Sequence, residues 1–242
     1  MTPDEEADRL LELMVAVEQA IPRGLRREWD ARLARQPVLI ARQGVFAAHG
    51  GIFAYQLSAR SPELKTERAA AWNAHQHERA TAHVLGATFG RADLEHVAHG
   101  RLLFVRCPRA YVVGDLPVPP RPDRLVVEVP DGLHVDRAVV DGLRRLRSNG
   151  FRIALPGFVD RVEQRRLLPY VDFVKVDVRD LDVEGAPLVE VAASYGALLI
   201  AEFVESADQL AHARELGITL FQGNLLERAG VLDRAGARPV SM

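Results

Sequence analysis

Short apolar runs alternate with longer amphipathic segments along most of the chain, starting near Pro37. The runs are nearly continuous in Val, Leu, Ile and Phe, which is typical of strands buried on both faces of a parallel sheet. The longer segments repeat their apolar residues at helical spacing. The pattern predicts strands at residues 38–41, 52–57, 102–107, 125–129, 151–155, 172–178, 197–203 and 218–223.

The amphipathic segments predict the helices of an alternating strand–helix chain. In residues 135–148 the apolar side chains share one face, and Asn149 with Gly150 ends the helix. Residues 114–124 form a loop, because their four prolines exclude regular structure. The other helices are predicted at residues 64–89, 161–168, 184–195 and 206–216.

The succession of units and the length of 242 residues favour one closed α/β barrel over an open doubly wound sheet. Neither a G-x-G-x-x-G loop nor a Walker loop follows a predicted strand, so the nucleotide-binding open sheets gain no support. We expect a helical extension at residues 1–36, a TIM-like (β/α)8 barrel at residues 37–230 and a short tail at residues 231–242.

The N-terminal extension carries an apolar stripe formed by Leu10, Leu13, Met14 and Val17. Such a stripe either covers the bottom of the barrel or serves as a surface for self-association or for another protein. The sequence leaves both interpretations open.

The amino-acid composition disfavours several classes of binding partner. Lys and Arg number 31 against 33 Asp and Glu, a net charge of -2, which gives no attraction to DNA, RNA polymers or an anionic membrane. No apolar run is long enough to span a bilayer. The single cysteine, Cys107, excludes an internal disulfide and suits a reducing compartment, so we expect a cytoplasmic protein. Cys107 follows Arg106 and is either a buried structural thiol or an activated nucleophile.

Polar residues stand at the ends of the predicted strands, where parallel barrels place their functional groups. Lys175 and Glu202 lie inside apolar runs, and a charge buried there needs a partner. We therefore predict an ion pair of Lys175 with Glu128 or Glu202, and we expect Arg106 in the barrel mouth near Glu128. The residues at the strand ends are Gln56, Arg106, Glu128, Pro156, Gly157, Lys175, Asp177, Glu202, Glu205 and Gln222.

Several separated segments resemble, in order and spacing, the EAL domain, and specifically the subfamily that is usually joined to an HDOD module. The resemblance covers residues 36–228 and implies a TIM-like barrel whose first strand is antiparallel to the others. It also implies hydrolysis of cyclic di-GMP with Mg or Mn. The segments are LIARQGVF, IFAYQLSAR, RLLFVR, RLVVEV, NGFRIALPGF, VDFVKVDVRDLD, YGALLIAEFVES and ELGITLFQGNLLER.

Carried over residue by residue, the resemblance implies an incomplete catalytic site. The glutamate of the E-A-L motif is Gln56, a metal-binding asparagine is Arg106, and the paired aspartates are Pro156 and Gly157. The loss of these ligands and the added positive charge disfavour a two-metal centre. The positions that keep the family residue are Arg60, Glu128, Lys175, Glu202, Glu205 and Gln222.

Three functions follow as alternatives. We expect a catalytically degenerate EAL-like signalling protein that acts through a protein partner or self-association and needs no cofactor or metal. The first alternative is a metal-independent cyclic-di-GMP receptor that binds through Arg60, Arg106, Glu128 and Gln222, with Arg106 on a phosphate. The second alternative is an active cyclic-di-GMP phosphodiesterase with Mg or Mn, or acid–base chemistry of Lys175 with a glutamate. Residues after 230 are too few for an HDOD module, so we expect the chain either to act alone or to meet its partner domain in trans.

Overall fold

A computed structural model describes residues 39–60, 74–91 and 94–232 of the chain. The chain divides into two compact units, Met1–Pro37 and Val38–Met242, and every described residue belongs to the second. The expectations for the extension at residues 1–36 lie outside the described residues. So do the first part of the helix predicted at 64–89 and most of the tail. No helix in the described ranges is long and apolar enough to cross a bilayer.

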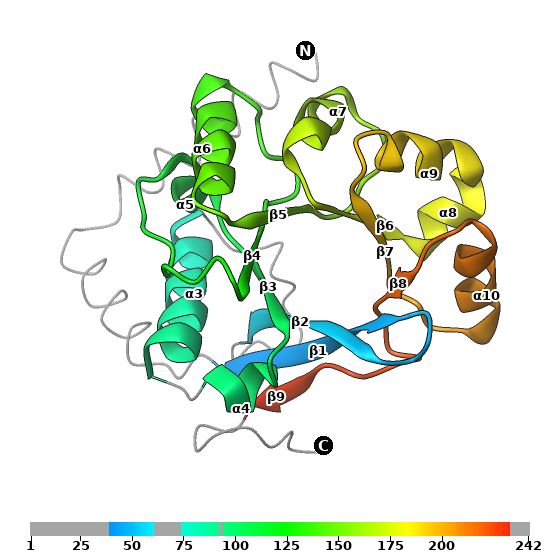
Figure 1. Cartoon of the computed structure of the whole chain (residues 1–242), viewed down its shortest axis with the longest axis horizontal. Helices are drawn as coiled ribbons and strands as arrows, with labels where there is room; N and C mark the ends of the chain where they lie inside the picture. Colours follow the sequence, from blue (N-terminus) through cyan, green and yellow to red (C-terminus); the bar gives the residue numbers. More distant parts are fainter. Residues whose placement is uncertain (1–38, 61–73, 92–93, 233–242) are drawn as a thin grey trace, which may run out of the picture. The chain divides into compact units, whose positions relative to one another are not determined.

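The strands form a closed barrel of mixed direction (Figure 1). Strands β2 to β8 follow one another in parallel, and β1 lies antiparallel between β2 and β8 and closes the ring. The predicted TIM-like barrel with an antiparallel first strand is therefore confirmed. The strands of the ring are β1 (Leu39–Ala47), β2 (Ile52–Arg60), β3 (Leu102–Arg106), β4 (Leu125–Glu128), β5 (Arg152–Leu155), β6 (Phe173–Asp177), β7 (Leu198–Glu202) and β8 (Leu220–Phe221).

Two strand features differ from the predicted pattern. Strand β8 has only two residues, although the apolar run predicted six, because only Leu220 and Phe221 pair with both β7 and β1. A further strand, β9 (Gly230–Leu232), pairs antiparallel with Ile40–Arg42 of β1, whereas the last residues of β1 pair with β8. Its three residues give too short a pattern to be predicted from periodicity.

Helices surround the ring of strands in Figure 1. The predicted helices appear, but the stretch predicted as the end of the sixth strand begins α8, because the Asp177 side chain caps that helix by accepting from Arg179 N. The short helices α4 and α5 were not predicted. The bounds are α3 (Ala74–Leu85) continued by a π-helix (Gly86–Arg91), α4 (Leu94–Ala98), α5 (Arg109–Val113), α6 (Arg137–Ser148), α7 (Val162–Leu167) followed by a 3-10 turn (Leu168–Tyr170), α8 (Val178–Glu184), α9 (Ala186–Ala193) and α10 (Ala207–Glu215).

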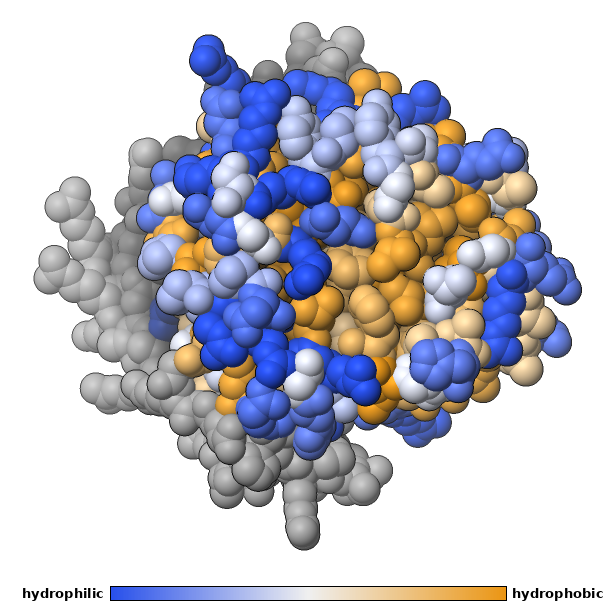
Figure 2. Space-filling model, viewed as in Figure 1, coloured by the Kyte–Doolittle hydropathy of each residue, from blue (hydrophilic) through white to orange (hydrophobic). Residues whose placement is uncertain are grey.

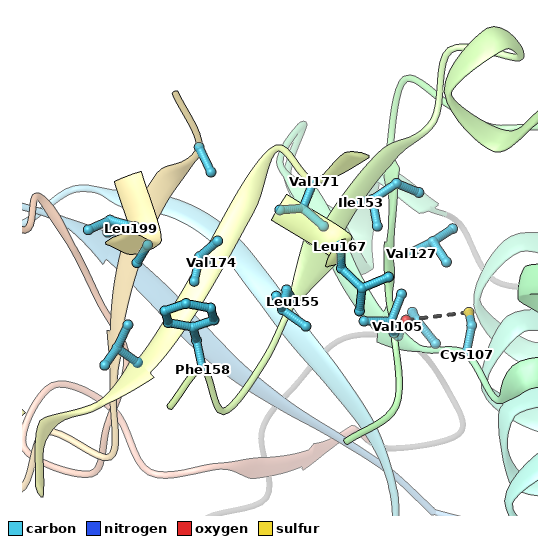
Figure 3. Packing of buried hydrophobic residues seen from close by; sticks show 14 of the residues in the cluster. Val105, Cys107, Val127, Ile153, Leu155, Phe158, Leu167, Val171, Val174 and Leu199 are labelled. Carbon is cyan, nitrogen blue, oxygen red and sulfur yellow. Dashed lines mark hydrogen bonds between the residues drawn. The ribbon is translucent and has the colours of Figure 1, made fainter. Parts of the chain in front are cut away.

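Side chains on the outer surface of the strands pack against the helices (Figure 3). Cys107 lies fully buried in this cluster, and its thiol donates to the Val105 carbonyl at 3.4 Å. Burial raises the pKa of the Cys107 thiol far above its usual value, and the nearby Glu128 adds to the rise. The structural interpretation of Cys107 is therefore supported over the nucleophilic one.

The inward-facing side chains form a second, separate apolar cluster across the strands. Phe104 and Phe173 lie at its centre, with ring centroids 5.0 Å apart in an edge-to-face arrangement. Figure 2, in the same view as Figure 1, shows hydrophobic residues over the middle of this face and hydrophilic ones over α6. The cluster consists of Val45, Ala54, Phe104, Val126, Ala154, Phe173, Ile200 and Leu220.

Candidate functional site

A charged layer lies directly above the apolar cluster inside the barrel. Side chains two residues apart on a strand point to the same face, so Phe104 predicts the direction of Arg106, and Phe173 that of Lys175. The register places Arg106 opposite Glu128, on neighbouring parallel strands. The residues of this layer are Gln56, Arg106, Glu128, Lys175, Glu202 and Gln222.

Lys175 is the centre of the layer and has only 1% of its surface exposed. Its Nζ donates to Gln56 Oε1 at 2.7 Å, to Glu202 Oε1 at 3.1 Å and to Gln222 Oε1 at 3.3 Å. These three hydrogen bonds use the three protons of an ammonium group. Glu128 Oε2 lies 2.8 Å from the same Nζ and forms an ion pair with it. Both predicted ion pairs of Lys175 are therefore present.

The charge on Lys175 is held in place by its surroundings. Burial opposes protonation, but the carboxylates of Glu128 and Glu202 outweigh it and raise the pKa of Lys175. The aromatic face of Phe104 lies beneath, with Nζ 5.1 Å from the ring centroid. A buried ammonium group with a raised pKa and no free proton is a poor acid–base catalyst, so the geometry disfavours that alternative.

Arg106 lies in the barrel mouth near Glu128, as predicted. Its Nε is 3.3 Å from Glu128 Oε1, and its Nη1 is 3.0 Å from Asp131 Oδ2. The Arg106 side chain is 46% exposed, whereas that of Glu128 is 3% exposed. Burial would lower the pKa of Arg106, but Glu128 and Asp131 raise it. Arg106 therefore joins a buried carboxylate to one at the surface.

The two glutamates of the layer respond in opposite directions. Burial favours the neutral form of Glu128, but Lys175 and Arg106 together outweigh it and lower the pKa of this carboxyl. Glu202, whose side chain is 13% exposed, has a raised pKa, because burial and the negative charge of Glu128 together outweigh the opposing effect of Lys175. Glu128, which has two cationic neighbours, is thus the better neutralised anion of the pair.

The amide side chains extend the layer toward the segment after β8. Gln222 Nε2 donates to Gln43 Oε1 at 2.9 Å, and Gln43 Nε2 donates to the Glu227 carbonyl at 2.9 Å. Gln56 Nε2 donates to the Phe104 carbonyl at 3.3 Å. Each amide thereby presents its oxygen toward Lys175 or toward the amide next to it. Gln43 lies two residues before the inward-facing Val45 on β1, so the two side chains share a face, and the sequence reasoning missed this signal.

The end of β5 brings no acidic group to the layer. Pro156 is buried, and Gly157 has a φ of +54°, a conformation that favours glycine. A side chain at Gly157 would meet Asp131 Oδ1, 3.4 Å from the position of its Cβ. The carboxylate near this strand end is therefore Asp131, from the loop between β4 and α6. Loop residues have no periodicity, and the sequence reasoning missed Asp131.

Two other predicted residues, Glu205 and Asp177, lie apart from Lys175, and the side chain of a third, Arg60, is outside the described residues. Glu205 is exposed in the loop after β7, and its backbone N–H donates to Gln209 Oε1 at 2.8 Å. Asp177 pairs with Arg179 on α8, with 2.5 Å between Oδ2 and Nη2. Arg60 ends β2, and its side chain is outside the described residues.

The residues of the mouth fit a divalent metal poorly. Mg²⁺ and Ca²⁺ need several oxygen ligands with uncompensated negative charge. Here the Lys175 ammonium group lies among the side-chain oxygens of the layer, and Arg106 forms ion pairs with both Glu128 and Asp131. Within the described ranges, no three His, Cys, Asp or Glu side chains are grouped so that they could hold a metal ion.

A small pocket of about 280 Å³ opens beside the mouth. It lies between the loop after β4 and the start of α7, and Asp131 belongs to both the pocket and the Arg106 ion pair. Buried leucines form part of its wall, and charged groups complete it. The lining residues are Pro130, Asp131, Gly132, Leu133, His134, Leu155, Pro156, Arg161, Glu163, Gln164 and Leu167.

The chain was compared with known protein families. The EAL domain family matches residues 116–229. Over these residues the barrel is similar to the EAL domain family.

Two curated proteins are similar to parts of the chain. The uncharacterized protein YuxH of Bacillus subtilis is 25% identical over 74% of this chain and 44% of its own length. The cyclic di-GMP phosphodiesterase CdgJ of Vibrio cholerae is 27% identical over 56% of this chain and 32% of its own. The chain thus spans less than half the length of each of these two relatives.

Solved structures agree in fold with the EAL-related barrel. BlrP1 of Klebsiella pneumoniae, in complex with calcium and cyclic di-GMP, matches with a TM-score of 0.65 and 23% identity, covering 81% of this chain and 56% of that one. An EAL domain protein of Listeria monocytogenes matches with a TM-score of 0.64 and 18% identity, covering 83% and 91%. At these identities the likeness supports the barrel architecture.

Proposed function

We propose that this EAL-related barrel is a catalytically degenerate signalling protein that acts through contacts with a protein partner or a second copy. The observation that carries the proposal is the charge balance in the mouth, where the cations Lys175 and Arg106 form ion pairs with the carboxylates of Glu128 and Glu202. Hydrolysis of a phosphodiester by two metals needs free carboxylates to hold them. In this barrel the buried carboxylates already have cationic partners.

The proposed subfamily, location and loss of catalysis rest on the sequence resemblance and on single residues. The segments at residues 39–46 and 52–60 support membership of the subfamily joined to HDOD modules, and a partner domain in trans is compatible with that origin. A cytoplasmic location suits the single buried thiol. The replaced positions Gln56, Arg106, Pro156 and Gly157 support the loss of catalysis.

A metal-independent cyclic-di-GMP receptor is the second candidate, and the exposure of Arg106 favours it. The Arg106 side chain is 46% exposed, so its guanidinium group is able to meet a phosphate by a charge-assisted hydrogen bond. Asp131 and Glu128 already bind the same group, however, so a phosphate would have to compete with two carboxylates.

Calorimetric titration with cyclic di-GMP, with and without Mg²⁺ or Mn²⁺, separates these functions when the mixture is then analysed for linear product. The proposal expects neither heat nor product. Binding at micromolar concentration without product would establish the receptor instead. Linear product that disappears in Glu128→Gln would show that the barrel is a phosphodiesterase and that the proposal is wrong.

A further inference from the structure

Phe203 is an exposed aromatic residue in a backbone conformation that suits glycine. It follows β7 directly, has a φ of +59° and is 56% exposed. A side chain with Cβ is disfavoured at positive φ, and residues held there cluster at functional sites. Burial does not account for the choice of Phe at this position, because more than half of the side chain faces solvent.

Helix α8 provides the surroundings of Phe203. The Arg179 guanidinium lies 5.5 Å from the centroid of the Phe203 ring, and Asp177 fixes Arg179 through contacts at 2.5 and 3.0 Å. Val183, on the same helix, is 80% exposed. Val183 lies four residues after Arg179, on the same face of α8. The Phe203 ring and an aliphatic side chain on the helix face that carries Arg179 thus remain open to solvent.

Negative charge surrounds these apolar side chains. Burial raises the pKa of Asp180, and the nearby Asp177 and Glu184 raise it further, so these three carboxylates share one field. The negative charges of Asp180 and of Glu205, which follows β7, both raise the pKa of Arg179. Helices α8 and α10 touch, which adds the exposed start of α10 to this region. The acidic residues at the end of β6, in α8, in the loop after β7 and in the first turn of α10 are Asp177, Asp180, Asp182, Glu184, Glu205 and Asp208, and Arg179 is the basic residue of these segments.

We propose that this surface, named the Phe203 face and formed by Arg179, Val183, Phe203 and the acidic side chains around them, binds an arginine-bearing segment of a partner protein. A guanidinium group stacks on an aromatic ring and also pairs with carboxylates in a planar, bidentate way. The Phe203 face offers both kinds of group side by side. Arg179 on the Phe203 ring is an internal example of the same stacking.

Charge complementarity selects this occupant. The whole chain has a net charge of only -2, so the excess of carboxylates on the Phe203 face is local. Such a field repels the phosphates of a nucleotide and attracts a cationic segment. Exposed aromatic anchors within a charged rim are also typical of protein interfaces. The inference rests on the proposed function, since it names the kind of partner that a signalling barrel acting through contacts would take.

The test uses the full chain and three fluorescent peptides, hexa-arginine, hexa-lysine and hexa-glutamate, followed by anisotropy at low and moderate salt. We expect hexa-arginine to bind at least about fivefold more tightly than hexa-lysine, because lysine lacks the planar group that stacks and pairs. Hexa-glutamate should not bind. Affinity for hexa-arginine should fall as salt rises, since part of the attraction is screened.

Phe203→Gly is the decisive variant, because glycine accepts the backbone conformation without strain. It should fold with an unchanged or higher melting temperature and bind hexa-arginine about tenfold more weakly. Tyr195→Ala is the matched control, since it removes an exposed aromatic side chain at the opposite end of β7. Glu205→Gln should weaken binding, whereas Glu163→Gln on α7 should not.

Three results would overturn the proposal. Equal binding of hexa-arginine and hexa-lysine, unchanged in Phe203→Gly, would show unspecific attraction to acidic groups. The absence of hexa-arginine binding would exclude the surface for this partner. Self-association of the chain that Phe203→Gly abolishes, without peptide binding, would assign the face to a second copy. Hydrolysis of cyclic di-GMP is a separate readout, so product formed by a chain that still binds hexa-arginine through Phe203 would sink only the proposed loss of catalysis.

Discussion

The interior of the barrel has two layers of side chains on the same strands, and the two layers have different roles. In the lower layer Phe104 and Phe173 pack edge to face among apolar side chains. In the upper layer, two residues further along, Arg106 and Lys175 meet buried carboxylates. Apolar packing tolerates many similar side chains, whereas a buried charge requires a specific partner. The lower layer therefore stabilises the fold, and the upper layer determines what the mouth is able to bind.

The largest effect is expected from Phe104→Ala in the lower layer. The change removes a fully buried ring that contacts Phe173 and also lies beneath Lys175. It should lower the free energy of unfolding by about 3 to 5 kcal/mol, measured by urea denaturation. Phe53→Ala, at the partly exposed edge of the same cluster, is the control and should cost clearly less. Equal losses would mean that the interior packing is loose.

Lys175→Met should come next, because it leaves Glu128 and Glu202 buried without their shared cation. Loss of one partner from a buried ion pair costs about 3 kcal/mol or more. Removing the two negative charges as well, in the triple variant Lys175→Met, Glu128→Gln, Glu202→Gln, should restore most of the stability. If the single variant is as stable as the wild type, the upper layer is not a set of matched charges.

Arg106→Gln should have a smaller effect, about 1 kcal/mol, because half of the side chain is in solvent and its ion pairs are screened. Arg109 provides a matched comparison, since it pairs with Asp136 at similar exposure but touches no buried carboxylate. Arg109→Gln should change the free energy of unfolding by less than about 0.5 kcal/mol. A larger loss for Arg109→Gln than for Arg106→Gln would contradict the role given to Glu128 here.

Glu205→Gln should have the smallest effect on stability, within about 0.5 kcal/mol, because the side chain is exposed and lies apart from Lys175. Thermal unfolding of this variant beside Glu202→Gln compares two glutamates three residues apart. A marked loss in Glu205→Gln would place this residue in the charged layer after all.

The sequence predicted the strands and, through them, much of the mouth. Lys175 inside an apolar run required a carboxylate, and the neighbouring strand ends offered Glu128 and Glu202. These predictions succeeded because strand periodicity fixes which side chains share a face, and parallel strands bring their ends together.

The remainder depended on features that periodicity does not encode. Asp131 stands in a loop, where spacing says nothing about direction, yet its carboxylate binds Arg106. Helix α8 was missed because Val178 continues the alternating apolar pattern of Val174 and Val176 in β6, while Asp177 caps the helix that begins there. The positive φ of Phe203 has no signature in the sequence, since phenylalanine seldom adopts it.

The most direct test of the charge-matched mouth is calorimetric titration of the wild-type protein with Mn²⁺, in the presence of cyclic di-GMP and in its absence. If Lys175 and Arg106 already neutralise Glu128 and Glu202, no heat of binding should be measured at micromolar to millimolar Mn²⁺. Uptake of Mn²⁺ at micromolar concentration that is lost in Glu128→Gln would show that these carboxylates are free to hold a metal, and it would contradict the account.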